Sequence, residues 1–260
     1  MPNESKLPAT LTSHRLNCID VGARGGMQRH WRPYVGAIQN IDLFEPDAAA
    51  CEKQAQRAEK NESWFPVALG GLTGTGKLHV TQRPSGSSLY RPNEDVIFRF
   101  AAPSYGKIAK ILDVPLMTLS DFIDKYQRPL PNLLKLDVQG AELDILKNTR
   151  QEHWRDLLAV QAEVEFISFY EGQPLFHDVD AFMRQQGFAH RPAIVERPDH
   201  IGQGHAHFVK KHLIDFALAI DQLNRTHGDA GRGHIQEHKA DALLRLAAGI
   251  GAHQAEHAVG

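Results

Sequence analysis

The sequence predicts an α/β fold built on a doubly wound sheet of parallel strands. Three observations predict it: short apolar runs alternate with helix-like segments along most of the chain, a glycine cluster follows the first apolar run, and an acidic residue ends the second. Ligands of such sheets bind beyond the carboxyl ends of the strands. The sequence therefore also predicts where a functional site lies.

The composition is that of a globular protein that needs no cross-link to fold. Of its 260 residues, 42% are hydrophobic and 23% are charged, which is ordinary for soluble domains. A chain of this length buries enough apolar surface without a disulfide or a structural metal. Its two cysteines, Cys18 and Cys51, have neither metal-ligand spacing nor a secreted disulfide pattern, so we expect a cytoplasmic protein.

The charge balance and the chain start argue against two classes of partner. Lys and Arg total 29 against 31 Asp and Glu, and the net charge of -2 provides no field that would hold nucleic acid. Residues 1–14 lack the basic and apolar regions of a signal peptide. No apolar run reaches the roughly eighteen residues that a membrane span needs, so we expect none.

The first part of the chain predicts three strands and a helix. We expect strands over residues 16–21, 38–44 and 64–69, because short apolar runs there end at turn-forming residues. Pro46 starts a helix with an acidic first turn that continues to about residue 60. The extended stretch 77–81 follows a glycine-rich turn and predicts an inserted hairpin.

Proline and glycine interrupt residues 82–113, which predicts loops that cover part of the molecule. Alternation then resumes. We expect strands over 114–119, 133–138, 157–166 and 207–210, and helices over 120–126, 141–148 and 178–186. Ser120 or Asp121 is available as the N-cap of the first of these helices, and Gly187 ends the last.

Near residue 212 the alternation of strands and helices ends, and amphipathic and glycine-rich segments follow. We expect an N-terminal extension over residues 1–14, one main domain over 15–212, and a helical extension with a frayed end over 213–260. We expect an amphipathic helix over 213–223 and a further helix over 235–248, and the amphipathic tail from residue 213 would pack on the chain's own domain or on a second copy in a homo-oligomer.

The loop after the first strand is a candidate cofactor loop. Asp20 ends the strand, and Gly22, Ala23 and Gly25 let a ligand approach the backbone closely. The loop lacks the G-x-G-x-x-G spacing that cradles a pyrophosphate. The methionine end of S-adenosylmethionine would suit it, with its carboxylate on backbone N–H groups and its ammonium on Asp20. The alternative interpretation is a tight turn between strand and helix.

Glu45 lies about twenty residues beyond this loop, at the end of the second strand. An acidic side chain at that place accepts hydrogen bonds from both ribose hydroxyls of a nucleoside cofactor. The alternative is a Glu that caps the helix starting near Pro46.

The segment around residue 137 is the most specific motif in the chain. Lys135, Asp137, Gly140 and Glu142 stand where a predicted strand turns into a helix. Their spacing, K-x-D-x-x-G-x-E, resembles the hallmark of the FkbM-type methyltransferases. Further similarity to this family lies in residues 19–23, 43–46, 67–70, 87–89, 164–166 and 170–176.

This resemblance implies a class I methyltransferase, a Rossmann-like fold with a mostly parallel seven-stranded sheet and helices on both faces. It implies that S-adenosyl-L-methionine is the cofactor and that the acceptor is an oxygen, commonly the hydroxyl of a sugar or natural product. The cofactor-binding residues that we expect are Asp20, Gly22, Ala23, Gly25, Glu45, Pro46, Ala68, Ser88 and Asp137.

Transfer of a methyl group to a hydroxyl requires removal of the hydroxyl proton as the oxygen attacks. Asp137 is the first candidate base, and Glu163 and Glu165 follow, since alternation places both on one face of their strand. Asp137 has an alternative role, accepting hydrogen bonds from the N–H groups of Gly140 and Ala141 at the helix start. Glu142 has the same two interpretations.

Several features favour ordinary structural roles. The i,i+4 histidine pairs in the tail, His234 with His238 and His253 with His257, lack a clearly spaced third ligand, so we expect a solvated helix and no metal. The aromatic residues Phe166, Phe169, Tyr170 and Phe176 wall an acceptor pocket or pack in the core.

The sequence therefore predicts an O-methyltransferase that acts on a hydroxyl of a small molecule or a glycan precursor. Two other functions remain open. The first is a catalytically inactive module that still binds S-adenosylmethionine and docks a partner through its C-terminal helices. The second is an NAD-dependent oxidoreductase, which the missing pyrophosphate loop disfavours.

Overall fold

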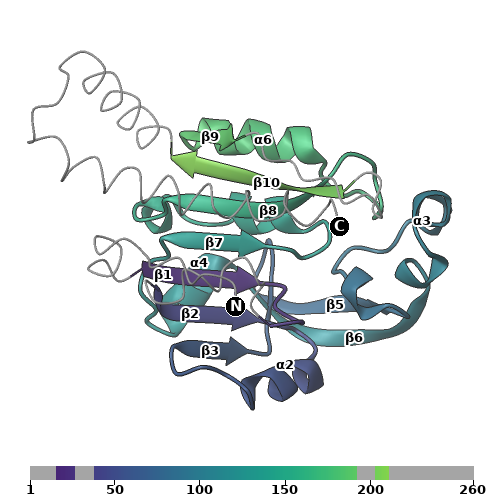
Figure 1. Cartoon of the computed structure of the whole chain (residues 1–260), viewed down its shortest axis with the longest axis horizontal. Helices are drawn as coiled ribbons and strands as arrows, with labels where there is room; N and C mark the ends of the chain where they lie inside the picture. The colour runs from purple at the N-terminus through teal and green to yellow at the C-terminus, as the bar shows by residue number, and fades with distance from the viewer. Residues whose placement is uncertain (1–15, 27–37, 192–202, 211–260) are drawn as a thin grey trace, which may run out of the picture.

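The computed structural model describes residues 16–26, 38–191 and 203–210 (Figure 1). The strands of the main sheet are β1 (Leu16–Val21), β2 (Ile38–Phe44), β3 (Glu62–Phe65), β7 (Leu133–Leu136), β8 (Ala159–Glu165), β9 (Phe188–Arg191) and β10 (Gln203–Lys210). Its helices are α2 (Ala48–Ala55), α4 (Leu119–Lys125), α5 (Glu142–Lys147) and α6 (Phe176–Gln185), with a 3₁₀ turn at Gln151–Trp154.

The main sheet has seven strands in the order β3-β2-β1-β7-β8-β10-β9. Strands β3, β2, β1, β7 and β8 run parallel to one another, whereas β10 pairs antiparallel with both β8 and β9. Consecutive parallel strands need crossover connections, which is why strands alternate with helices in the chain. The order reverses direction between β1 and β7, and in such sheets the ligand crevice lies at that point.

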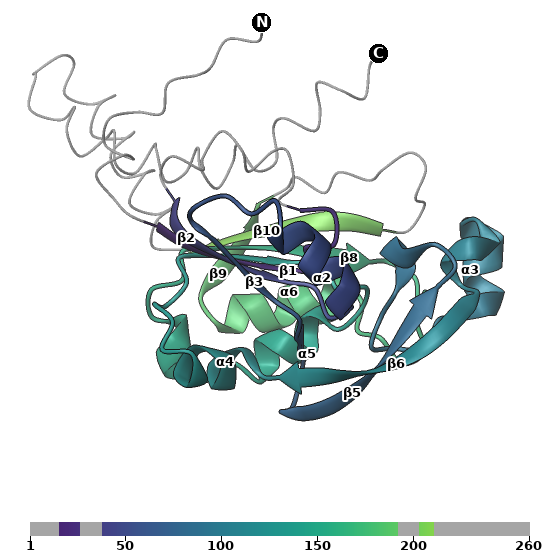
Figure 2. The ribbon, with the colours of Figure 1, turned by 90° about the horizontal axis from the view of Figure 1, so that it is seen from below.

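Both faces of the sheet carry buried apolar side chains. On one face Ile19, Leu136 and Val164 belong to a large cluster, and α4, α5 and α6 cover this face (Figure 2). On the other face Cys18, Leu43 and neighbouring apolar side chains form a second buried cluster. The sheet is therefore an internal layer, and the predicted α/β class is confirmed.

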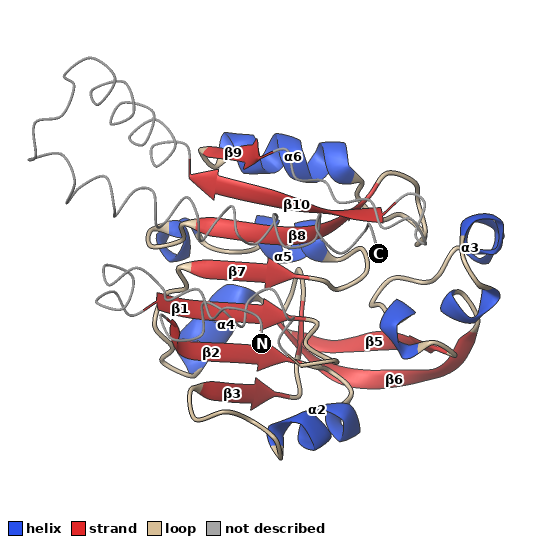
Figure 3. Cartoon of the chain, viewed as in Figure 1, coloured by secondary structure: helices blue, strands red, loops and turns tan. Residues whose placement is uncertain are grey.

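A second, three-stranded sheet lies beyond the carboxyl ends of the main strands (Figure 3). It comprises β4 (Ala68–Leu69), β5 (Gly74–Thr81) and β6 (Ile108–Met117) in the order β4-β6-β5. Between β5 and β6 the chain forms a helix, α3 (Glu94–Phe100), and 3₁₀ turns at Pro84–Gly86 and Pro103–Tyr105. This insertion covers the ligand side of the main sheet.

Three predicted elements differ from the structure. The strand expected over 64–69 is two strands in different sheets, because Pro66 separates β3 from β4 and has no N–H for a ladder. The hairpin partner of β5 is β6, which begins at Ile108 inside the region expected to be loops and extends only to Met117, not to residue 119. The N-cap of α4 is Thr118, whose side chain accepts a hydrogen bond from the Asp121 N–H, and not Ser120 or Asp121.

Other boundaries shift by a few residues. Helix α2 ends at Ala55 and not near residue 60. Strand β10 starts at Gln203, earlier than expected, and β9 was not expected at all. Gly187 ends α6 in the predicted way, with a φ of 79°. The expected extensions, the helices over 213–223 and 235–248, and the tail histidine pairs lie outside the described residues. Among the helices that are described, none is long and apolar enough to cross a membrane.

Candidate functional site

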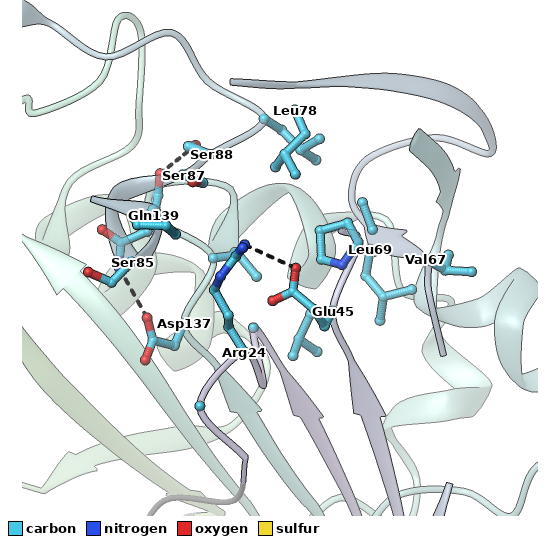
Figure 4. A pocket seen from close by; sticks show the side chains of 18 of the residues that line it. Arg24, Glu45, Val67, Leu69, Leu78, Ser85, Ser87, Ser88, Asp137 and Gln139 are labelled. Atoms are coloured by element: carbon cyan, nitrogen blue, oxygen red, sulfur yellow. Dashed lines mark hydrogen bonds and ion pairs between the residues drawn. The ribbon is translucent and has the colours of Figure 1, made fainter. Parts of the chain in front are cut away.

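A pocket of about 230 Å³ lies at the carboxyl ends of β1, β2 and β7, under the inserted sheet (Figure 4). Seven of the predicted cofactor residues line it: Gly22, Gly25, Glu45, Pro46, Ala68, Ser88 and Asp137. Asp20 and Ala23 are buried but do not line it. Glu163 and Glu165 do not line it either. The structure thus brings together most of the predicted cofactor residues from segments far apart in the chain.

The loop after β1 lies against the end of β7. Gly22 has a φ of +83°, and a Cβ on it would stand 1.9 Å from the backbone oxygen of Asp137. Only glycine fits such a close approach in the left-handed region. The N–H groups of Gly22 and Ala23 donate to the Phe44 carbonyl at 3.1 Å and 2.9 Å, so these two groups anchor the loop to β2.

Lys135 explains why Asp20 is buried. Its Nζ lies 2.9 Å from Asp20 Oδ1 and 3.6 Å from Asp137 Oδ2, and donates to the carbonyls of Val21 at 3.3 Å and Gly22 at 3.2 Å. Burial disfavours the ammonium, but the two carboxylates outweigh burial and hold the pKa of Lys135 above its ordinary value. Lys135 therefore ties β1, the glycine loop and Asp137 into one unit.

Glu45 is held at the opposite side of the pocket. Its Oε1 accepts from the Asp47 N–H at 2.9 Å and lies 3.4 Å from Arg24 Nη1. Arg24 also lies 3.2 Å from Asp47 Oδ2, and the Asp47 side chain caps α2 by accepting from Ala50 at 3.4 Å. The helix cap is thus Asp47, and Glu45 keeps its place on the pocket wall, although burial raises its pKa.

The two acids of the K-x-D-x-x-G-x-E motif, Asp137 and Glu142, have different structural roles. Glu142 accepts hydrogen bonds from Val138 N–H at 2.8 Å and Gly140 N–H at 2.9 Å, so Glu142 and not Asp137 satisfies the backbone at the start of α5. Asp137 instead lines the pocket with 22% of its side chain exposed. The alternative role considered for both acids, accepting hydrogen bonds from backbone N–H groups at the helix start, is therefore that of Glu142.

Glu163 pairs with Asp137 behind the pocket. Its carboxyl group hydrogen-bonds to Asp137, and burial followed by the charge of Asp137 raises the pKa of Glu163 well above its ordinary value. Two carboxyl groups joined in this way share a proton. Glu165 lies two residues further along β8 and is buried, with 1% of its surface exposed. Asp137 is thus the acid of the pocket wall on this side, with Glu163 as its carboxyl partner, and Glu45 lines the opposite side.

Gln139 and Tyr170, neither of which was among the predicted catalytic or cofactor-binding residues, join these acids to the inserted sheet. Gln139 lines the pocket, and its Nε2 donates to Asp137 Oδ1 at 3.1 Å and to Glu163 Oε2. Its carbonyl accepts from Ser88 Oγ at 2.7 Å. Tyr170 OH lies 2.9 Å from Gln139 Oε1. The only sequence signal for Gln139 is its position inside the motif.

The aromatic segment after β8 packs mainly inward. Phe169 and Tyr170 are buried in a cluster with Ile97 of α3, while Phe166 and Phe176 contact each other with ring centroids 5.4 Å apart. Among the residues that the structure describes, no group of three His, Cys, Asp or Glu side chains could hold a metal ion. His207, on β10, is buried.

Replacing Glu142 with Gln should destabilise the fold. An amide supplies only one acceptor for the two N–H groups of Val138 and Gly140, and an unmet buried hydrogen bond costs about 1–3 kcal/mol. Burial raises the pKa of Glu142 from 4.5 to about 7. A folded-state pKa above the unfolded value gives stability at low pH that is lost as pH rises through about 7, and the variant should lose this dependence.

Urea unfolding at about pH 5 and about pH 8 measures both effects. Glu152→Gln is the control, because Glu152 is an exposed acid near a helical start and should leave the unfolding midpoint unchanged. An E142Q protein as stable as the wild type at both pH values would contradict the capping role.

Comparison with known proteins decides the family. A family model described as a methyltransferase FkbM domain matches residues 20–189. The chain belongs to the FkbM methyltransferase family. The match covers the pocket, the motif and the acid pair, and it confirms the resemblance found in the sequence. It also favours methyl transfer over NAD-dependent oxidoreduction.

Individual relatives of this FkbM methyltransferase carry similar names. Methyltransferase 1 of Beauveria bassiana (strain ARSEF 2860) is 30% identical over 193 residues, 70% of this chain and 74% of that protein. Methyltransferase sdnD of Sordaria araneosa is 27% identical over 192 residues, 65% of this chain and 72% of that protein. A solved magnesium protoporphyrin IX methyltransferase from Synechocystis PCC 6803 with bound SAM covers 78% of this chain and 75% of its own, at 13% identity and a TM-score of 0.38.

As a member of this family, the FkbM methyltransferase described here uses S-adenosylmethionine as its cofactor. The pocket fits that group. Glycine is required at Gly22, where a Cβ would fill the space beside Asp137, and the acidic Glu45 lines the pocket directly after β2, the place of the ribose-binding acid in doubly wound nucleotide-binding folds.

Proposed function

We propose that the protein is an O-methyltransferase that transfers a methyl group to a hydroxyl of a small molecule or a glycan precursor. One observation carries the proposal: the Asp137–Glu163 pair borders the cofactor pocket, and Asp137 is part of its wall. A hydroxyl is a poor nucleophile until it loses its proton, so its methylation needs a base at the reacting end of the cofactor.

The residues of the pocket divide into binding and acid–base groups. Glu45 accepts hydrogen bonds from the ribose hydroxyls, while the backbone of Gly22 and Gly25 and the small side chains of Ala68 and Ser88 allow close contact with the cofactor. Bound there, S-adenosylmethionine supplies an electrophilic methyl group on its sulfonium. The sequence assigned the cofactor ammonium to Asp20, but Lys135 neutralises Asp20 beneath the pocket wall, so we assign the ammonium to the Asp137 side of the pocket.

Asp137 and Glu163 act on the acceptor. The pair carries one shared proton, so one carboxylate equivalent is available to accept the proton of the hydroxyl. Glu163 hydrogen-bonds to Asp137, so the single negative charge is shared between these two carboxyl groups. The inserted sheet covers the pocket from above, and Val67, Leu69 and Leu78 give it an apolar wall that excludes water from the methyl group (Figure 4).

Calorimetry with S-adenosylhomocysteine tests cofactor binding through a matched pair of glycine variants. Gly22→Ala places a Cβ 1.9 Å from the Asp137 oxygen at a φ of +83°, whereas Gly187→Ala, at a φ of +79° and away from the pocket, meets no atom within 4 Å. The left-handed alanine and the loop shift it forces should weaken binding by about 10-fold to 100-fold. Gly187→Ala carries the same left-handed strain outside the pocket, so it should bind as the wild type does.

A wild-type protein that does not bind S-adenosylhomocysteine would reject the proposed function. Equal binding by both glycine variants would reject the placement of the cofactor over the loop. An assay of methyl transfer to a panel of hydroxylated acceptors then separates an enzyme from an inactive S-adenosylmethionine-binding module, because only the enzyme releases S-adenosylhomocysteine in an acceptor-dependent way.

A further inference from the structure

Gln139 occupies a backbone conformation that a glutamine rarely adopts. Its φ is +61°, and among the described residues the only other non-glycine residue with positive φ is Gln127. Left-handed backbone costs an L-residue roughly 1–2 kcal/mol, and such conformations persist where surrounding contacts enforce them. The turn could be made by glycine or asparagine at lower cost, so the long side chain of Gln139 needs a reason to be there.

The contacts of Gln139 supply that reason. Its Nε2 has two hydrogens, and two carboxyl oxygens receive them, Asp137 Oδ1 at 3.1 Å and Glu163 Oε2. A shorter amide would not span both acids. The amide thus bridges a residue of the pocket wall and a residue of β8.

Tyr170 determines which end of the amide faces the acids. Its hydroxyl lies 2.9 Å from Gln139 Oε1 and 3.1 Å from the Gly86 carbonyl, so its hydrogen is shared between two acceptors. With Oε1 engaged by Tyr170, Nε2 faces the carboxyl groups. The opposite orientation would point an amide oxygen at two acids and leave the Tyr170 hydroxyl beside an NH₂ group.

We propose that Gln139 is a positioning residue, whose amide holds Asp137 and Glu163 in the geometry of an acid pair, and that Tyr170 fixes the orientation of this amide. The inference rests on the proposed function, since it assigns a role to residues around the proposed base. The Ser88 hydrogen bond to the Gln139 carbonyl ties the same residue to the inserted sheet above the cofactor pocket.

The ionisable groups that interact with Glu163 come from β7, β8, α5 and the loop after β8. Lys135 and Asp137 face it from β7 and its end, Glu165 from β8 itself, and Glu142 from α5. Tyr170 interacts with it from the loop after β8, and β10 places His205 opposite it in the register. Among these neighbours the amide of Gln139 adds a neutral donor to the Glu163 carboxylate. A hydrogen bond to the charged form lowers a pKa, so loss of this donor must raise the pKa of Glu163.

Carbon-13 NMR of the full-length protein with labelled glutamate carboxyl groups tests this directly, with E163Q used to assign the Glu163 signal. Tyr170→Phe removes only the hydroxyl that orients the amide. Gln139→Asn keeps a residue that tolerates left-handed backbone, but its shorter side chain cannot reach both Asp137 and Glu163. In both variants the titration midpoint of Glu163 should rise by about one pH unit.

Tyr90→Phe is the matched control. Tyr90 also donates across the insertion, to Asp144 Oδ2 at 2.9 Å, but it does not touch the acid pair, so the Glu163 midpoint should stay at the wild-type value. The proposal is overturned if Tyr170→Phe and Gln139→Asn leave the midpoint unchanged while both still bind S-adenosylhomocysteine. Failure of the proposed function gives a different result, namely no S-adenosylhomocysteine binding by the wild type.

Discussion

Asp137→Asn should lower kcat for methyl transfer by about 10²-fold to 10⁴-fold, the usual contribution of a general base. Asparagine has the shape of aspartate and still accepts a hydrogen bond from Gln139, but it cannot take a proton from the acceptor. Because the cofactor ammonium is assigned to the Asp137 side of the pocket, binding of S-adenosylhomocysteine should weaken as well, and kcat is therefore compared at saturating S-adenosylmethionine. The measurement is the rate of acceptor-dependent S-adenosylhomocysteine release, alongside calorimetry of each variant.

The same substitution should move the titration of Glu163 downward. The charge of Asp137 and its hydrogen bond both raise the pKa of Glu163, so removing them lowers it. This direction is opposite to the one expected for Gln139→Asn, where a donor is lost. Opposite shifts of the Glu163 titration in the two variants would therefore distinguish Asp137, which shares the proton with Glu163, from Gln139, which positions the two carboxyl groups.

Asp144→Asn is the control for this experiment. Asp144 lies nearby on α5 and accepts a hydrogen bond from Tyr90, but it does not line the pocket, so kcat should stay within about twofold of the wild type. If Asp137→Asn retains kcat within tenfold of the wild type, Asp137 is not the base. Glu163→Gln is then the variant that should lose activity.

The central strands were predictable because each is buried on both faces. Strands β1, β2, β7 and β8 appear in the sequence as short segments with several closely spaced apolar residues, and most of their residues are buried. Their boundaries in the structure agree with the expected ones within about two residues. The number of strands in the sheet, seven, was implied by the family resemblance and not by the pattern itself.

The inserted sheet was not predictable in the same way. Strand β6 is mostly exposed over its first six residues and contains Pro115, so its sequence shows neither an apolar run nor a clear alternation. Its partner β5 pairs with it across more than twenty-five intervening residues, from Thr81 with Ile108 outward. Pairing over such a distance depends on the surrounding fold, and local propensity does not specify it.

The site was predictable as a set of positions but not as a set of contacts. Residue types and strand ends placed Glu45 and Asp137 at the pocket, because the carboxyl ends of neighbouring parallel strands meet at one edge. Which acid caps the helix depended on side-chain direction after Gly140, where φ is +108°. The pairing of Asp20 with Lys135 joins residues far apart in the chain, and no spacing rule reveals it.

Lys135→Met should destabilise the protein by about 3–5 kcal/mol, the cost of leaving a buried charge without its partner. Lys135 is 1% exposed, and its ammonium neutralises Asp20 while binding the carbonyls of Val21 and Gly22. Methionine fills similar volume but supplies no charge and no donor. Chemical denaturation measures the loss of unfolding free energy.

The pH dependence of this loss identifies its cause. Burial already raises the pKa of Asp20 above 3.8, and without Lys135 it must rise further. A folded-state pKa above the unfolded value gives stability that is present at low pH and lost as pH rises through the folded value. Lys135→Met should therefore be less destabilised at about pH 5 than at about pH 8.

A double variant separates the charge from the packing. Asp20→Asn combined with Lys135→Met removes both members of the buried pair, so it should recover at least half of the lost stability and show no extra loss at high pH. If the double variant is as unstable as Lys135→Met alone, the lysine stabilises the loop through the carbonyls of Val21 and Gly22, and Asp20 is not the reason for its burial. In that case the glycine loop, and with it the cofactor pocket, depends on Lys135 as a donor to the backbone.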